Sequence, residues 1–278
     1  MLYNAKTLES YALESLEGDF REIVQFYFDD RCWMIRSLEA YVGENPLPDR
    51  KVLISTDSLL AVAQKEGRIH SSLTRTQIDN CPVMSSDISA SRQFEAALHD
   101  YFVSPSTAQA GSESLPRIPY TNLDAGLAKQ RVCDLREDVG STHLRSTHEV
   151  ACHHIEAMDG ELGHVADFLI DDQTWTVRYL VADTLNWWPG RKVLIATEWI
   201  ESISEEESKV FVGLTREAIR EAPEYDEHAV ITRDYETTLH RHHNRIGYWL
   251  GKTCDTDDRM QSLQQAANAL RPLHSLEV

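Results

Sequence analysis

An internal repeat constrains the fold of this chain more than any other feature of its sequence. The segment from Gly18 to Ala40 matches the segment from Gly160 to Ala182 at a constant offset of 142 residues. The match is carried by Gly18/Gly160, Phe26/Phe168, Asp29/Asp171, Asp30/Asp172, Trp33/Trp175 and Arg36/Arg178. The register continues at an offset of 141 from Arg50/Arg191 to His99/His240, because the connecting loop is one residue shorter in the second copy. The chain is therefore predicted to contain two copies of one unit.

Each copy has the pattern of a mainly β unit. In the second copy, Trp175, Val177, Tyr179 and Val181 alternate with the residues between them, which is the period of a pleated strand. The residues between this strand and the one before it, Asp171 to Thr174, are typical of a hairpin loop. The other predicted strands of this copy are Leu162–Ile170, Lys192–Ile195 and Lys209–Val212.

Short helices are expected after the strands of each copy. Thr215 is placed to cap a helix over Arg216–Glu221, and Thr74–Gln77 has the capping-box pattern in the first copy. Later in the first copy, apolar residues between Phe94 and Phe102 fall on one face of a helix. The sequence thus predicts two β units, each with a helical tail.

The residues of the second copy resemble the PRC-barrel domain. They include Asp159-Gly160, Gly163, Val165, Asp167, Phe168, Asp171, Asp172, Trp175 and the run PGRKVL at 189–194. The whole chain is similar to the bacterial tandem form, in which two such copies each precede a short helical tail. The resemblance implies a mainly β fold of two small PRC-barrel-like β-barrels in tandem, each followed by short helices.

The repeat and the resemblance together divide the chain into four parts. These are a first copy with its helical tail (1–103), a connecting segment (104–143), a second copy with its tail (144–250) and a polar C-terminal tail (251–278). We expect each copy to fold separately and the two to stack. The first copy departs from the family pattern, because Arg21 replaces Gly163 and Gln25 replaces Asp167. It also has Glu44–Pro48 in place of Asn186–Gly190 and so lacks the two tryptophans of that loop, which indicates that the two copies are no longer interchangeable.

Charge and composition bear on partners and compartment. The chain has 27 basic and 45 acidic side chains, for a formal net charge of −18. A surface that binds phosphates needs clustered Lys and Arg, so direct nucleic-acid binding is not expected. No apolar run reaches the roughly 20 residues of a membrane-spanning helix, so direct membrane insertion is not expected either. Five scattered cysteines and a start without a signal-peptide pattern favour a cytoplasmic protein.

Two Asp-Asp pairs admit two readings. Asp29/Asp30 and Asp171/Asp172 have the residue type of metal ligands or acid–base groups. Both pairs lie between predicted strands, where Asp side chains bond to the backbone two residues on. The turn-forming interpretation is therefore favoured over the catalytic one.

Two histidine clusters are the weak candidates for a metal site: His148, His153 and His154, and then His240, His242 and His243. The segment from His148 to His153 resembles the HExxH motif but has one residue too many to place both rings on one helical face. A zinc site also needs three or more oriented ligands. Packing is the favoured interpretation, and no cofactor is predicted.

The aromatic loop of the second copy is the favoured contact surface. Trp187, Trp188 and Pro189 lie between two strands that already have their own core aromatics, and Trp249 lies near the end of the helical tail. Exposed aromatic residues concentrate at protein interfaces. We therefore expect these four residues to contact the other copy or a partner protein.

The PRC-barrel resemblance implies a docking role, as in the cytoplasmic part of the photosynthetic reaction-centre H subunit and in a ribosome-maturation factor. Catalytic serine or cysteine motifs and phosphate-binding glycine loops are not found in the sequence. The leading interpretation is a non-enzymatic adaptor or regulatory module that binds a protein partner or a second copy of itself. The alternatives are a membrane-peripheral accessory of electron transport and a metal-dependent hydrolase that uses the histidine clusters.

Overall fold

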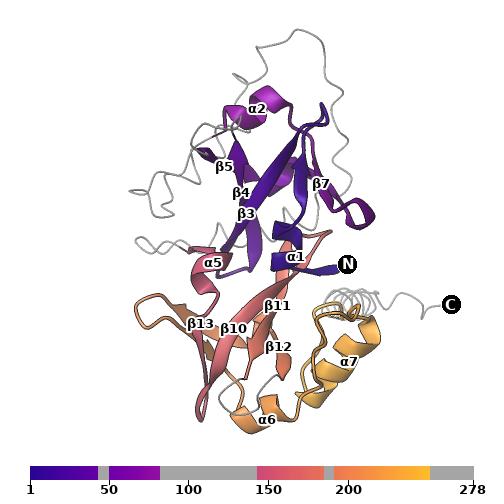
Figure 1. Cartoon of the computed structure of the whole chain (residues 1–278). Helices are drawn as coiled ribbons and strands as arrows, with labels where there is room; N and C mark the ends of the chain where they lie inside the picture. The colour runs from indigo at the N-terminus through magenta and orange to yellow at the C-terminus, as the bar shows by residue number, and fades with distance from the viewer. Residues whose placement is uncertain (43–49, 82–142, 185–190, 251–278) are drawn as a thin grey trace, which may run out of the picture. The chain divides into compact units, whose positions relative to one another are not determined.

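A computed structural model describes residues 1–42, 50–81, 143–184 and 191–250 (Figure 1). They belong to two compact units. The larger comprises Met1–Arg220 with Glu224–Asp226, and the smaller comprises Glu221–Pro223 with Glu227–Val278. The predicted mainly β class is confirmed, since strands dominate the described residues. Among these residues, no helix combines the length and the apolar character needed to cross a membrane.

The first half of the larger unit combines two long central strands with shorter strands and short helices. A central hairpin is formed by β3 (Phe20–Asp29) and β4 (Met34–Val42), which pair antiparallel. The capping box predicted at Thr74 is confirmed, because Thr74 and Gln77 exchange hydrogen bonds at the start of α2. The other elements are β1 (Leu2–Asn4), α1 (Ala5–Glu9), β2 (Ala12–Glu14), β5 (Arg50–Ser55), η1 (Thr56–Ser58), β6 (Leu59–Ala63), η2 (Gln64–Glu66), β7 (Arg68–Ser71) and α2 (Arg75–Asp79).

The second half carries elements in a closely similar order. Its hairpin is formed by β10 (Gly160–Asp171) and β11 (Thr176–Asp183). The helix predicted after Thr215 is present as α6 (Arg216–Arg220), one residue shorter than expected. The remaining elements are β8 (Leu144–Ser146), α5 (Thr147–Val150), β9 (His154–Ala157), β12 (Lys192–Ala196), η4 (Thr197–Trp199), β13 (Ile200–Ser204) and β14 (Lys209–Val212).

The described strands form one mixed sheet. Its main path runs β13-β14-β9-β10-β11-β4-β3-β2-β7-β6, so the strands on either side of the β11–β4 contact follow equivalent orders. Two pairs, β2–β7 and β9–β14, are parallel, and the hairpins are antiparallel. The path does not close on itself within the described residues, because β13 and β6 are its two ends.

The first strand of each half pairs with the other half. Strand β1 pairs with the end of β10, and β8 pairs with the end of β3. We expected the two copies to fold separately and then stack, and the structure differs at this point. The physical reason is that the ends of β3 and β10 have open edges, and a strand from the opposite half satisfies their backbone groups. Aromatic packing continues across the junction, where Phe28 and Phe168 have ring centroids 5.6 Å apart.

The smaller unit contains α7 (Arg233–His242). Thr232 caps its N-terminus by accepting a hydrogen bond from the backbone N–H of Tyr235. After the helix, Tyr248 returns to it and donates a hydrogen bond of 2.9 Å to the buried carboxylate of Glu236. The helix predicted near Phe94–Phe102 and the segments 104–142 and 251–278 lie outside the described residues.

Candidate functional site

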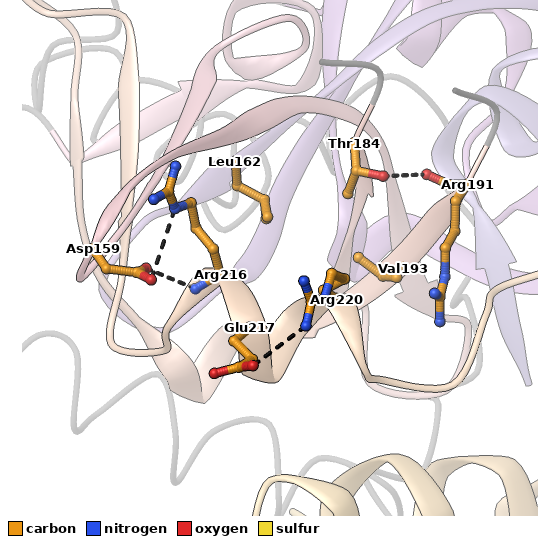
Figure 2. Close-up of a pocket in the computed structure, with 8 residues that line it drawn as sticks. All are labelled: Asp159, Leu162, Thr184, Arg191, Val193, Arg216, Glu217 and Arg220. Carbon is orange, nitrogen blue, oxygen red and sulfur yellow. Dashed lines mark hydrogen bonds and ion pairs between the residues drawn. The ribbon is translucent and has the colours of Figure 1, made fainter. Parts of the chain in front are cut away.

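A pocket in the second half is the strongest candidate for a binding site. It has a volume of about 160 Å³ and lies where β10, β12 and α6 meet (Figure 2). Its lining combines apolar and charged side chains, which is the composition of many small ligand sites. The residues that line it are Asp159, Leu162, Thr184, Arg191, Val193, Arg216, Glu217 and Arg220.

Two buried aliphatic side chains provide the apolar part of the pocket. Leu162 comes from β10 and Val193 from β12, and both are almost fully buried. Gly163 permits the close approach of the strands at this place, because a Cβ there would overlap the carbonyl oxygen of Asp183. A glycine at this position therefore determines how β10 meets the end of β11 beside the pocket.

Charged side chains surround the apolar part. The carboxylate of Asp159 accepts a 2.7 Å hydrogen bond from the backbone N–H of Arg216 and lies 3.7 Å from its guanidinium (Figure 2). The guanidinium of Arg220 lies 3.3 Å from Glu217 on the same helix. On the opposite side, the hydroxyl of Thr184 donates to the carbonyl oxygen of Arg191. The lining thus has three arginines against two carboxylates in a chain of strongly negative net charge.

The equivalent place in the first half is built differently. Arg21 stands where the second half has Gly163, and Asp79 stands where it has Arg220. The guanidinium of Arg21 donates a 3.2 Å hydrogen bond to Asp79. The two differences belong together: Arg21 places a side chain where the second half has none, and Asp79 on α2 supplies the carboxylate that pairs with it. Because Arg191 and Arg216 have counterparts in Arg50 and Arg75, the features that distinguish the second half are its glycine at 163 and its third arginine at 220.

A second polar cluster joins the two halves. Asp30 of the first half contacts His143 and Arg145 at 2.9 Å each, and Arg145 also donates a 2.7 Å hydrogen bond to Glu205. The pKa of Glu149 is raised, first by burial and then by a hydrogen bond shared with the carboxyl group of Glu205. Paired carboxyls that share a proton are also found in acid–base sites. Here the cluster of Arg145, Glu149 and Glu205 joins β8, α5 and the β13–β14 turn. None of these three residues lines the pocket.

The first histidine cluster does not converge on one point. His148 lies 3.3 Å from Glu9 and His154 lies 2.9 Å from Glu161, both at exposed places. His153 is buried, and burial lowers the pKa of its imidazole. Within the described parts of the chain, no group of three or more His, Cys, Asp or Glu side chains has the arrangement of a metal site.

The second histidine cluster lies in the smaller unit on and after α7. His240 is buried and packs edge-to-face on Trp249, with ring centroids 5.0 Å apart. The rings of His242 and His243 contact each other edge-to-face, with centroids 4.7 Å apart. Burial, followed by the charges of neighbouring histidines, lowers the pKa of His243 to about 4. His240 is thus packed within its own unit and His243 is half-buried, whereas His242 is exposed.

The Asp-Asp pairs occupy equivalent hairpin turns. The carboxylate of Asp29 accepts a 3.0 Å hydrogen bond from the backbone N–H of Arg31, and that of Asp171 accepts a 3.2 Å bond from Gln173. Asp29 also receives a 3.1 Å hydrogen bond from Arg36, as Asp171 receives one of 3.2 Å from Arg178. The second member of each pair contacts the exchanged strand: the backbone N–H of Asp30 donates to His143, and that of Asp172 donates to Met1.

The predicted aromatic surface is described only at one residue. Trp187, Trp188 and Pro189 lie outside the described residues. Within the smaller unit, the guanidinium of Arg233 lies over Trp249, and its carbon is 4.4 Å from the centroid of the Trp249 ring. Sequence reasoning missed the arginines of the pocket, although the contrast between Arg220 and Asp79 at matched places in the repeat is a signal that could have found them.

A scan against protein-family models and a search of the curated proteins gave no match for this chain.

Proposed function

We propose that this protein is a non-enzymatic adaptor or regulatory module, built from two PRC-barrel-like copies, that binds a protein partner through its second half. The duplicated sequence and the equivalent strand orders on either side of the β11–β4 contact support a tandem origin. The reciprocal pairing of β1 with β10 and of β8 with β3 supports it further. In such a duplication one copy can specialise while the other retains a structural role.

The arginine-lined pocket is the observation that carries the proposal. It is present where Gly163 and Arg220 stand, whereas Arg21 and Asp79 form a salt bridge at the matched place of the first half. Met158, which directly precedes the pocket residue Asp159, has 71% of its surface exposed. An exposed methionine beside an apolar cavity with arginines is typical of a protein-binding surface.

The chemistry of the pocket favours recognition over catalysis. The guanidinium groups of Arg191, Arg216 and Arg220 serve as hydrogen-bond donors and positive charges. The two carboxylates are each positioned by an arginine of the same lining. Such a set of groups can hold a complementary acidic surface in a fixed orientation.

Site-specific photo-crosslinking in the native cell tests this function. A photoreactive amino acid replaces Met158 in the full chain, and the matched control carries it at Leu16, the equivalent turn residue of the first half, which is 58% exposed. We expect one specific protein to crosslink at position 158 and not at position 16. Equal crosslinking at both positions, or none at 158, would contradict the proposal, as would turnover of a metabolite by the purified chain.

A further inference from the structure

We propose that the pocket binds a small organic carboxylate whose apolar body has roughly the size of a six-carbon group. This inference deepens the proposed function and rests on it, because it assigns a ligand to the surface through which the partner docks. The ligand and the partner then act on one site, which makes the module responsive to the concentration of a metabolite of this class.

The size of the cavity sets the size of the apolar body. An engineered cavity of about 150 Å³ lined by aliphatic side chains binds benzene. The pocket has a similar volume of about 160 Å³, and Leu162 and Val193 belong to its lining. Removal of a six-carbon body from water into this cavity supplies the favourable free energy of the apolar end.

The arginines determine the charge of the polar end. Arg220 is paired with Glu217 at 3.3 Å, and the two side chains are 47% and 73% exposed. An exposed pair of this kind is weak, so the carboxylate of a ligand can replace that of Glu217 at small cost. The planar guanidinium then binds the ligand with two parallel hydrogen bonds. A cationic ligand of the same shape would instead meet three arginines against two carboxylates, each of which is already paired with one of these arginines.

The ion pair of Arg216 fixes the other side of the pocket. Its backbone N–H and guanidinium both contact Asp159, and a Cβ built at Gly160 would lie 3.4 Å from the guanidinium carbon. Arg216 is therefore a positioning residue that holds its positive charge beside the cavity. In the first half, Arg21 and Asp79 are bonded to each other at the matched place, so we expect one ligand per chain.

Calorimetric titration of the full chain tests the inference with sodium hexanoate and hexylammonium chloride as probes. We expect saturable 1:1 binding of hexanoate and none of hexylammonium. The variant Arg220→Gln should weaken hexanoate binding by about tenfold or more, since it removes a charge-assisted hydrogen bond. Glu217→Gln should strengthen binding because it removes the competing carboxylate. The matched control Arg241→Gln, at an exposed position of α7, should bind hexanoate as the wild type does.

Several results would overturn the inference: no saturation with hexanoate, equal binding of hexylammonium, or an Arg220→Gln variant that binds hexanoate as well as the wild type. The exposure of Arg220 makes loss of folding in this variant unexpected, and Glu217→Gln provides an independent gain of affinity. Crosslinking at position 158 without hexanoate binding would overturn the assignment of a carboxylate ligand to the pocket and would leave the adaptor function intact. Hexanoate binding without crosslinking would overturn the adaptor function alone.

Discussion

Trp33 and Trp175 join the two halves by reciprocal backbone hydrogen bonds. The carbonyl oxygen of Trp175 accepts a 2.7 Å hydrogen bond from Ile35, and that of Trp33 accepts one of 2.7 Å from Val177. Both tryptophans have positive φ angles, 58° and 46°, which few residues with side chains adopt. The β11–β4 contact therefore depends on two strained turns that occupy matched positions of the repeat.

Truncation of Trp33 tests how strongly this junction contributes to stability. Its ring is buried and stacks on Phe28, with centroids 5.3 Å apart, and Phe28 in turn contacts Phe168. We expect Trp33→Ala to lower the free energy of unfolding by about 3–5 kcal/mol, measured by urea denaturation. The control Trp249→Ala lies in the smaller unit and should leave the main transition nearly unchanged. A loss below about 1 kcal/mol for Trp33→Ala would refute this role.

The close approach at Gly163 predicts a second stability effect. A Cβ at this position would overlap the backbone oxygen of Asp183, so the strands must move apart to accept it. We expect Gly163→Ala to destabilise the protein by about 1–3 kcal/mol. In the control Gly213→Ala, the nearest atom is the flexible carboxylate of Glu201 at 3.0 Å, and we expect little change. Similar thermal midpoints for the two variants would argue against the packing described here.

The hydrogen bonds between Asp30 and Arg145 predict that both halves lose stability together. These side chains are 11% and 12% exposed, and their pair at 2.9 Å links β3 to the β8 strand of the other half. Replacement by Arg145→Met leaves the carboxylate of Asp30 partly buried, with the ring of His143 2.9 Å away. We expect a loss of about 1–3 kcal/mol in one cooperative unfolding transition. Two separate transitions, observed by circular dichroism and by tryptophan fluorescence, would contradict the exchange of strands between the halves.

The low pKa of His243 predicts a pH dependence for the smaller unit. Because folding lowers this pKa from 6.5 to about 4, the unfolded state binds more protons between these pH values. The part of the free energy of unfolding that depends on neutral His243 is therefore fully present above pH 6.5 and is lost as the pH falls toward 4. The variant His243→Gln should show less of this loss, measured by hydrogen exchange of α7, whereas His228→Gln should behave as the wild type because His228 is 88% exposed. Equal pH profiles for all three proteins would contradict this source of the effect.

Local features of the fold could be predicted from the sequence where a few neighbouring residues determine them. The capping box at Thr74 and the strand around Val177 are of this kind, because their hydrogen bonds and their alternation are both local. The pairing of β1 with β10 could not be predicted in this way. Strand β1 has three residues, too few for a period, and its partner lies far along the chain.

The candidate site was missed for a related reason. Arg216 and Arg220 lie on a helix of five residues and have no motif that marks them, so only their spatial meeting with Leu162 and Val193 makes a pocket. The histidines drew attention because their residue type is common in metal sites, although proximity in sequence does not direct side chains to one point. The comparison of Arg220 with Asp79 within the repeat was the informative signal.

The central claim is tested most directly with the partner protein that crosslinks at position 158. The measurement is the amount of this partner that each of two charge-reversal variants recovers. Arg220→Asp changes the pocket, and Arg75→Asp makes the same change on α2, the equivalent helix of the first half. Both variants have the same net charge. We predict that Arg220→Asp reduces recovery of the partner by about tenfold or more, while Arg75→Asp recovers it as the wild type does. Undiminished recovery with Arg220→Asp, or an equal reduction with both, would contradict the assignment of the docking site to the second half.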